Sequence, residues 1–131
     1  MRSDVPLGIT LSAGLDSNSI AYAMQEFDSA PHHCFTSRFL AGEEPVQDKL
    51  VYVDTGQKID ESISARRVAQ ELRLNSHIIE SNFADFVPML TRIIWHLESG
   101  NRSPAVFPMM QLFMKASKKV TVMLEGQGAD E

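Results

Sequence analysis

The chain has 131 residues, which suits one domain or part of one and is long enough to bury a single core. Its composition, with 44% hydrophobic and 22% charged residues, is typical of a soluble globular chain, and the net charge of −5 without a basic block argues against nucleic acid as a partner. The single cysteine, Cys34, excludes an internal disulfide and fits a reducing cytoplasm, while the absence of a signal peptide and of any apolar run near roughly 18 residues argues against a membrane partner.

The predicted strands are short and rich in apolar or β-branched residues. They cover Val5–Ser12 (VPLGITLS), His32–Phe39 (HHCFTSRF), Asn75–Ser81 (NSHIIES) and Val120–Leu124 (VTVML). A helix is predicted after the first strand, because Ile20, Met24 and Phe27 recur at helical spacing.

Three further helices are predicted along the chain. They cover about Glu61–Arg73, a segment within Phe83–Leu97 with Pro88 near its first helical position, and Pro104 to about Lys118 after a capping Ser103. The last of these is apolar nearly all round, which predicts burial on more than one side. Residues 40–60 show no period and are predicted to form a long loop.

Strands that alternate with helices indicate an α/β fold with a parallel sheet and right-handed crossovers. We expect the Val5–Leu11 strand inside the sheet, with His32–Phe39 on one side and Val120–Leu124 on the other. Ligands of such sheets bind beyond the carboxyl ends of the strands. Two glycine-containing turns lie at such ends, Ser12–Ser17 and Glu125–Asp130.

The first of these turns, SAGLDS, has the residue types of a phosphate site. A helix N-terminus presents unpaired N–H groups and the positive end of the dipole, and the hydroxyls of Ser12 and Ser17 add donors. Asp16 would then be an anion among anions, which a magnesium ion held by Asp16 and Asp130 would resolve. The structural alternative has similar weight on spacing alone: Asp16 caps the helix and Gly14 makes a tight turn.

Four blocks of the sequence resemble the glutamine-hydrolysing asparagine synthetase family. SDVPLGITLSAGLDSNSIA (residues 3–21) is similar to its pyrophosphatase loop, usually S-G-G-L-D-S-S after a D-V-P-V-G strand. IDESISARRVAQEL (59–72) is similar to D-E-S-x-x-A-R-x-V-A, IIWHLES (93–99) to V-W-H-L-D-E, and VMLEGQGADE (122–131) to V-L-S-G-E-G-A-D-E. Any one block is a weak signal, but four in the same order, over nearly the whole chain, are a strong one.

This resemblance implies a Rossmann-like three-layer αβα fold of the adenine nucleotide alpha hydrolase type. It also implies an ATP-dependent ligase that forms an acyl-adenylate from a carboxylate, with magnesium, and releases pyrophosphate before ammonia or another amine displaces AMP. The family's pyrophosphate and magnesium positions fall on Ser12, Ala13, Gly14, Asp16 and Ser17, with Asp130 as a second metal carboxylate. Its adenosine contacts fall on Leu11, Ser37, Glu125 and Gly126.

Several positions depart from the family pattern, among them Asn18 in place of a serine and Ser99 and Ser103 where acidic residues are common, and three further departures concern the expected chemistry. Ala13 stands where the family has glycine, and a positive φ there would cost about 1 kcal/mol. Glu125 replaces a serine and brings negative charge near the nucleotide. Gln127 replaces the glutamate at the reacting carboxylate, and an amide cannot accept a proton from an incoming amine. These departures put aspartate in question as the substrate, while nucleotide binding stays plausible.

The resemblance further implies ATP and a small carboxylate as partners, with a glutaminase domain in cis and room for a homodimer. Residues 1–131 are expected to be a single partial ATP-pyrophosphatase domain of a longer cytoplasmic protein, inactive alone, without the glutaminase domain and the C-terminal part of the synthetase domain. Two function classes remain: an amide-forming ligase, including relatives such as a β-lactam synthetase or peptide cyclase, and a non-catalytic nucleotide-binding or interaction module. Gln127 and Ala13 keep the second class open.

Several other residues are given structural roles. Cys34 lies within a strand pattern and is expected to be a small core residue rather than a nucleophile. His32 and His33 show no metal-ligand pattern and are expected at the surface or as support behind a site. Trp95 and His96 are expected to pack along their amphipathic segment.

Overall fold

The computed structural model describes residues 3–28, 30–39, 61–81, 83–100 and 105–126. The described elements, in chain order, are β1 (Leu7–Thr10), α1 (Leu15–Phe27), β2 (His33–Phe39), α3 (Glu61–Glu71), β3 (Asn75–Ser81), the 3-10 helix η1 (Phe83–Asp85), α4 (Phe86–Leu97), α5 (Val106–Ala116) and β4 (Val122–Leu124). Four predictions lie outside the described residues: the loop over 40–60, the helix start at Ser103 and Pro104, and the positions of Gln127 and Asp130.

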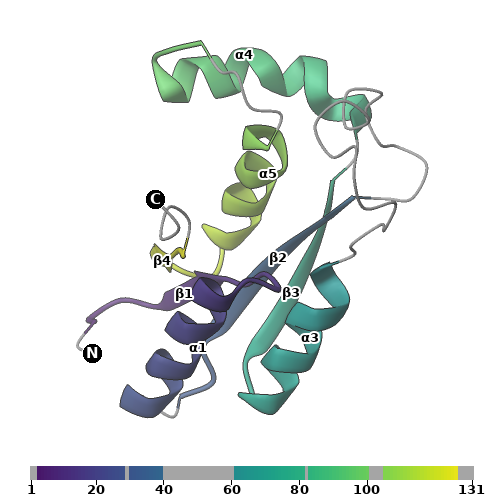
Figure 1. The fold of residues 1–131 in the computed structure, drawn as a ribbon. Helices are drawn as coiled ribbons and strands as arrows, with labels where there is room; N and C mark the ends of the chain where they lie inside the picture. The colour runs from purple at the N-terminus through teal and green to yellow at the C-terminus, as the bar shows by residue number, and fades with distance from the viewer. Residues whose placement is uncertain (1–2, 29, 40–60, 82, 101–104, 127–131) are drawn as a thin grey trace.

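The four strands form one parallel sheet in the order β3-β2-β1-β4 (Figure 1). β1 therefore lies inside the sheet, with β2 on one side and β4 on the other, as predicted. The register aligns Gly8 with His33 of β2 and with Met123 of β4. This order brings the carboxyl ends of β1 and β4 together, although they belong to opposite ends of the described chain.

Helices cover both faces of the sheet, which confirms the three-layer arrangement. On one face α1 and α3 pack against the apolar side chains of β1 and β2, around Ile9, Leu11 and Cys34, which are at most 2% exposed. On the other face Phe35 packs with Leu112 of α5. α5 also contacts α4, which crosses its N-terminal end, so α5 packs against both the sheet and a second helix, as predicted (Figure 1).

Several predicted elements extend beyond the observed ones. β4 begins at Val122 rather than Val120, because the N–H groups of Thr121 and Val122 both donate to the carbonyl of Pro6 and sheet pairing starts only there. α3 ends at Glu71 rather than Arg73. Arg73 has a left-handed φ of 54°, and the N–H of Leu74 donates back to Ala69, which closes the helix.

The other boundary differences are small. β1 covers Leu7–Thr10 instead of Val5–Ser12, and α5 ends at Ala116, two residues before the predicted Lys118. α4 follows the short η1 turn, as predicted, with Pro88 as its third residue. Proline is tolerated there because the first N–H groups of a helix have no partner within it.

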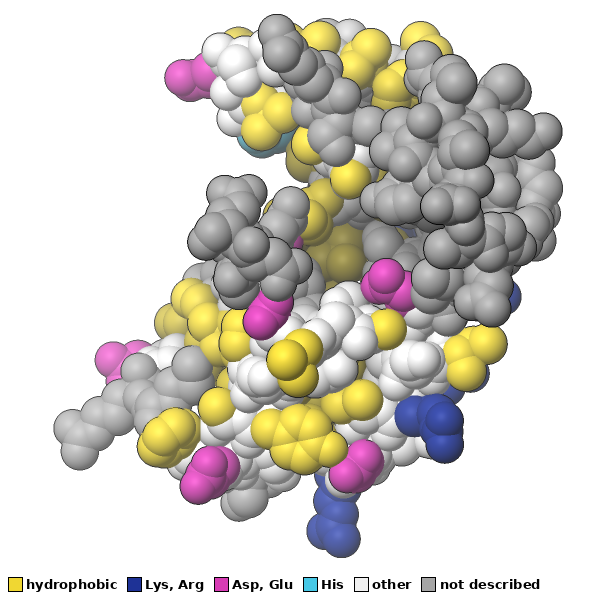
Figure 2. All heavy atoms as spheres, in the orientation of Figure 1, with side chains coloured by type: hydrophobic (Ala, Val, Ile, Leu, Met, Phe, Trp, Pro, Cys, Tyr) yellow, Lys and Arg dark blue, Asp and Glu magenta, His cyan; other side chains and the backbone are white. Residues whose placement is uncertain are grey.

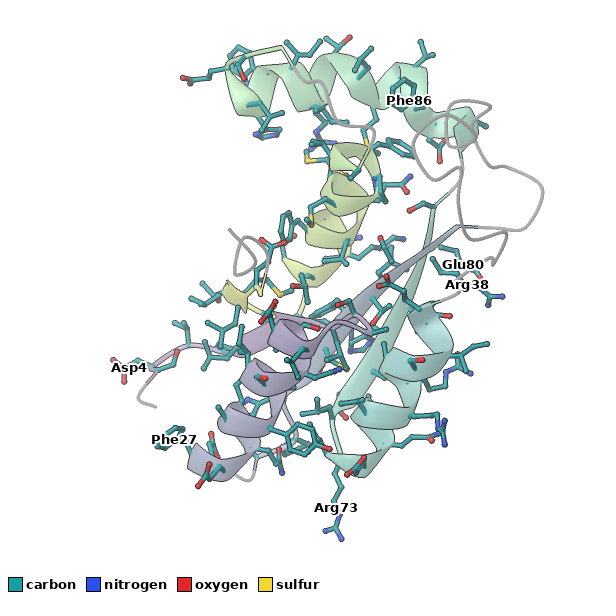
Figure 3. All side chains as sticks on the ribbon, in the orientation of Figure 1. Asp4, Phe27, Arg38, Arg73, Glu80 and Phe86 are labelled. Atoms are coloured by element: carbon teal, nitrogen blue, oxygen red, sulfur yellow. The ribbon has the colours of Figure 1, made fainter. Side chains whose placement is uncertain are left out.

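α4 is the least covered of the described helices. It packs on α5 through an edge-to-face contact of Phe86 and Phe107, whose ring centroids are 5.4 Å apart, and Figure 3 labels Phe86 where the helix begins. Figure 2 shows hydrophobic side chains on the surface over this helix. The prediction that Trp95 and His96 pack is wrong, since the Trp95 side chain is 77% exposed and His96 is exposed as well. Within α4 only Ile93 is buried. Among the described helices, none is long and apolar enough to cross a membrane.

Candidate functional site

The first element of the site is the carboxyl end of β1, which is fixed by β2. Leu11 is 2% exposed, and its N–H donates to the carbonyl of Phe35 at 2.9 Å. Its carbonyl accepts a hydrogen bond from the Thr36 hydroxyl at 2.7 Å. Both backbone groups of Leu11 are therefore satisfied by the neighbouring strand, so the turn that follows starts from a rigid position.

The turn Ser12–Ser17 is held together by its own hydroxyl groups. The Oγ atoms of Ser12 and Ser17 are 2.9 Å apart, and the N–H of Ser12 donates to Ser17 Oγ at 3.2 Å. Ser12 Oγ also accepts from the N–H of Gly14, and Ser17 Oγ lies 3.1 Å from the Gly14 carbonyl. Ser17 is buried and Ser12 is half-buried, so these bonds shape the turn from the inside.

The helix cap differs from the structural alternative raised above. The N-cap of α1 is Gly14, with φ −71° and ψ 151°, and no side chain caps the helix. Asp16 lies in the first turn instead, so its expected role as the cap is wrong. Among the described residues, no side-chain oxygen from the cap reaches the first N–H groups of α1, which is an arrangement that suits an anionic group.

Ala13 adopts an ordinary backbone conformation. Among the described non-glycine residues, only Arg73 and Glu98 have a positive φ. Ala13 therefore does not carry the backbone strain that a positive φ would have caused. Ala13 and Gly14 are both exposed, so the tip of the turn faces solvent.

The second turn approaches the first at Gly126. A β-carbon built on Gly126 would stand 2.8 Å from the backbone N of Ser17 and 3.0 Å from the carbonyl carbon of Asp16. Nearby, the hydroxyl of Thr10 donates to the carbonyl of Leu124 at 3.4 Å. The turn after β4 thus lies directly against the first turn of α1, so closely that no side chain fits between them.

The other expected residues lie around this junction. Glu125 is exposed beside Gly126, and Asp16 is half-buried on α1. Ser37 belongs to β2, and its hydroxyl is directed to the carbonyl of Pro108 in α5, 3.4 Å away, rather than to the Ser12–Ser17 turn. The structure therefore brings together Ser12, Asp16, Ser17 and Gly126, and leaves Ser37 apart from their hydrogen-bond network. Gln127 and Asp130 lie outside the described residues.

Two polar residues add to the site. Thr36, which holds the Leu11 carbonyl, was missed from the sequence, because it lies in the middle of β2 and no local signal marks it. Asn18 follows the turn in α1, and its Oδ1 is buried with no hydrogen-bond partner in the part of the chain that the structure describes. A buried acceptor of this kind, in the first turns of a helix that has no side-chain cap, fits a polar ligand that carries both donors and charge.

Cys34 lies behind this site and takes no part in it. It is fully buried on the α1–α3 face of β2. Burial raises the pKa of its thiol, with hydrogen bonds in the opposite direction as smaller effects. A neutral buried thiol is a poor nucleophile, which confirms the expected core role.

Comparison with known sequences gives relatives along the whole chain. Residues 1–131 match the family described as asparagine synthase. The chain is 31% identical over 131 residues to asparagine synthetase (glutamine-hydrolyzing) 1 of Bacillus subtilis (strain 168), which covers 100% of this chain and 18% of that protein. It is 29% identical over 138 residues to the nodule asparagine synthetase (glutamine-hydrolyzing) of Pisum sativum, covering 22% of that protein. The chain thus spans about a fifth of the length of these curated relatives.

Solved structures with the same arrangement have distant sequences. The U34-tRNA thiolase NcsA from Methanococcus maripaludis superposes with a TM-score of 0.53 at 16% identity, over 98% of this chain and 40% of its own. A predicted subunit of tRNA methyltransferase from Methanocaldococcus jannaschii gives a TM-score of 0.51 at 16% identity, over 96% of this chain and 54% of its own. At this identity the likeness concerns the fold alone, which is the expected α/β fold with a parallel sheet.

Proposed function

Because the chain belongs to the asparagine synthase family, we propose that it is the ATP-binding part of an ATP-dependent amide-forming ligase. In this proposal the protein adenylates a carboxylate, either aspartate or an analogue, and releases pyrophosphate, after which ammonia or another amine displaces AMP. The observation that carries the proposal is the close approach of Gly126 to the first turn of α1. It joins two turns, distant in sequence, into one site at a helix N-terminus.

The proposed role of the first turn is to hold the phosphates. The free N–H groups at the start of α1 would donate to phosphate oxygens, and the positive end of the helix dipole would favour their charge. The Ser12–Ser17 hydroxyl pair keeps the turn in one shape, so these donors need not reorganise as charge develops on the departing pyrophosphate. We propose that Leu11, Ser37, Glu125 and Gly126 contact the adenosine. Leu11 would do so through the second lone pair of its carbonyl, which already accepts a hydrogen bond from Thr36.

Magnesium is proposed as the counter-charge to the phosphates. Asp16 is half-buried in the first turn of α1, close to Gly126 of the second turn, and carboxylate oxygens are suitable ligands for this ion. Asp130 is proposed as the second carboxylate. When bound, the metal would neutralise phosphate charge, and the chain's own contribution would be to hold the two carboxylates, with Gly126 allowing the two turns to approach each other closely.

The wider assembly is also a proposal. We propose that residues 1–131 form part of a synthetase domain, that a glutaminase domain belongs to the same polypeptide, and that the protein works in the cytoplasm. A homodimer is a further proposal. Gln127 would lie near the reacting carboxylate, where its amide cannot take the proton of an incoming amine.

A second candidate is a non-catalytic nucleotide-binding module. It is supported by Gln127 at the family's glutamate position and by Ala13 at its glycine position. Both candidates need ATP binding at the first turn. They differ in whether the longer protein releases pyrophosphate when it is given a carboxylate, and only the ligase does so.

ATP binding, which both candidate functions require, is tested by a thermal melt with ATP and magnesium up to millimolar concentration. We expect ATP with magnesium to raise the melting temperature, because a ligand that binds only the folded state stabilises it. Asp16→Ala should remove most of the magnesium-dependent part. The control is Asp4→Ala, since Asp4 is exposed on the N-terminal segment and points away from the fold (Figure 3). If the folded wild-type chain shows no shift at millimolar ATP, the phosphate site is refuted.

A further inference from the structure

Two histidines form a hydrogen-bonded pair at the amino edge of the sheet, at the opposite ends of the strands from the candidate nucleotide site. His33 begins β2 and His77 lies in β3, and the Nδ1 atom of His33 is 2.9 Å from the Nε2 atom of His77. The two rings have centroids 5.1 Å apart. Both side chains are half-buried. At this distance one nitrogen carries the shared proton and the other accepts it.

The pair closes one end of the core beneath α5. His77 is aligned with Phe35 in the sheet register, and the two rings stack with centroids 4.9 Å apart. Phe35 packs in turn with Ala116 at the end of α5 and with Val120, which precedes β4. The histidine pair therefore supports the segment that connects α5 to β4.

The charged groups that act on the pair are positive, although Asp28 lies 3.4 Å from His32, and Asp4 and Asp28 line one pocket with His33. Lys119, in the segment between α5 and β4, acts on both rings, and His32 acts on His33. The imidazole of His33 also acts on His77. Burial, followed by these positive groups, lowers the pKa of both histidines below the ordinary value of 6.5. Among the described residues no carboxylate is a cause of either shift, so no described group there favours the charged form.

The first and the second proton that the pair binds have different effects on its hydrogen bond. With one added proton, an imidazolium can still donate to a neutral imidazole, so the bond survives. With two added protons both nitrogens carry hydrogen, the bond is lost, and two positive rings face each other beside Lys119. The second proton is therefore the one that breaks the contact.

From this arrangement we propose that the His33–His77 pair is a pH-sensitive clamp, which holds the α5–β4 connection against the sheet while at least one imidazole is neutral. Loosening of the α5–β4 connection would also affect the residues that follow β4. Gly126 follows this strand and lies against the first turn of α1, so an acid-loosened α5–β4 connection would also loosen the second turn of the candidate site.

The direction of the pH effect follows from linkage. Because the folded state lowers both histidine pKa values, it binds fewer protons than the unfolded chain below about pH 6.5. The stability that the neutral histidine pair contributes is therefore fully present above about pH 6.5. It is lost as the pH falls from this value through the lowered pKa values of the folded protein. Carboxylates titrate mostly near pH 4, so the interval between pH 5 and pH 7.5 isolates the histidines.

The experiment is a series of thermal melts between pH 7.5 and pH 5. The variant is His77→Gln, which keeps a polar side chain but cannot titrate, and the matched control is His96→Gln, which removes an exposed histidine of α4. We expect the melting temperature of the wild type and of the control to fall together as the pH is lowered, and that of His77→Gln to fall clearly less. Equal falls in all three proteins would overturn the proposal.

A second measurement requires no variant and covers the case in which His77→Gln does not fold. The imidazole resonances of the wild-type protein are followed by NMR through the same pH range. We expect the resonances of His33 and His77 to titrate in two coupled steps below pH 6.5, while the α5–β4 amides shift with the second step. Independent single steps at the ordinary histidine value would refute the clamp.

Discussion

Gly126 lies so close to Ser17 that a β-carbon on the glycine would stand 2.8 Å from the serine's backbone nitrogen. The contact is between backbone groups, not between side chains that could rotate away. A substitution at Gly126 therefore has to move one of the two turns that form the candidate nucleotide site.

The first prediction concerns this contact. Gly126→Ala should abolish or strongly reduce the ATP-dependent rise in melting temperature, because the added methyl group displaces the turn after β4 from α1. We also expect a loss of about 1–3 kcal/mol in unfolding free energy from overpacking. Gly100→Ala is the control, since nothing lies within 4 Å of a β-carbon there. A Gly126→Ala variant that keeps the wild-type ATP response would contradict the assignment of the second turn to the site.

The second prediction concerns the hydroxyl network of the first turn. Ser17→Ala leaves the N–H of Ser12 without its acceptor and removes the contact between the two hydroxyls. A lost buried partner of this kind costs about 1–3 kcal/mol, measured by urea unfolding. Ser19→Ala removes an exposed hydroxyl bond to the Leu15 carbonyl in the same helix and should change stability much less. Equal losses would mean that the turn does not depend on Ser17.

The third prediction separates two roles of Ala13. Its φ is not positive, so Ala13→Gly should relieve no strain and should lower stability by about 0.4–1 kcal/mol through the unfolded chain. If the methyl group crowds a bound phosphate, the same variant should bind ATP more tightly by calorimetry. Ala23→Gly, on the exposed face of α1, should lower stability without any gain in affinity. A purely structural turn predicts that neither variant changes ATP affinity.

The fourth prediction uses Cys34. Burial raises the pKa of this thiol, so the folded protein keeps it neutral and unreactive at pH 8. Iodoacetamide labelling, followed by mass spectrometry, should be slow in the native protein and fast in urea. Because the pKa of Cys34 is raised in the folded protein, the stability that its neutral thiol contributes is present at neutral pH. This contribution is lost as the pH rises through the raised pKa of the folded state. Rapid labelling of the native protein would show that β2 opens readily.

The sequence was most informative where one physical signal acted alone. Asn75–Ser81 was predicted with its observed bounds. At the ends of elements two signals compete: Val120 is apolar enough for a strand, but it packs in the core before sheet pairing begins at Val122. Trp95 was expected to pack because of its helical spacing, yet spacing only assigns a helix face and cannot say whether anything covers it.

The candidate site was predictable in its residue types but not in its contacts. The two turns and the helix N-terminus follow from the motif, whereas the close approach at Gly126 depends on strand order and register. The same applies to Thr36, whose hydroxyl reaches Leu11 across two strands, and to the pairing of His33 with His77. Cross-strand neighbours are set by the three-dimensional alignment of segments, and no local pattern of a single sequence records that alignment.

The strand order also determines when the site can form during folding. Thr10 and Leu124, which are 114 residues apart in the chain, meet beside the junction of the two turns. Closing so long a loop is slow and entropically costly, so β1, β2 and β3 can associate well before β4 arrives. β4 has three residues and occupies an outer position in the described sheet, where fraying is easiest. During synthesis on a ribosome, the Ser12–Ser17 turn would emerge early. The candidate site could not form until the polypeptide has been made beyond Gly126.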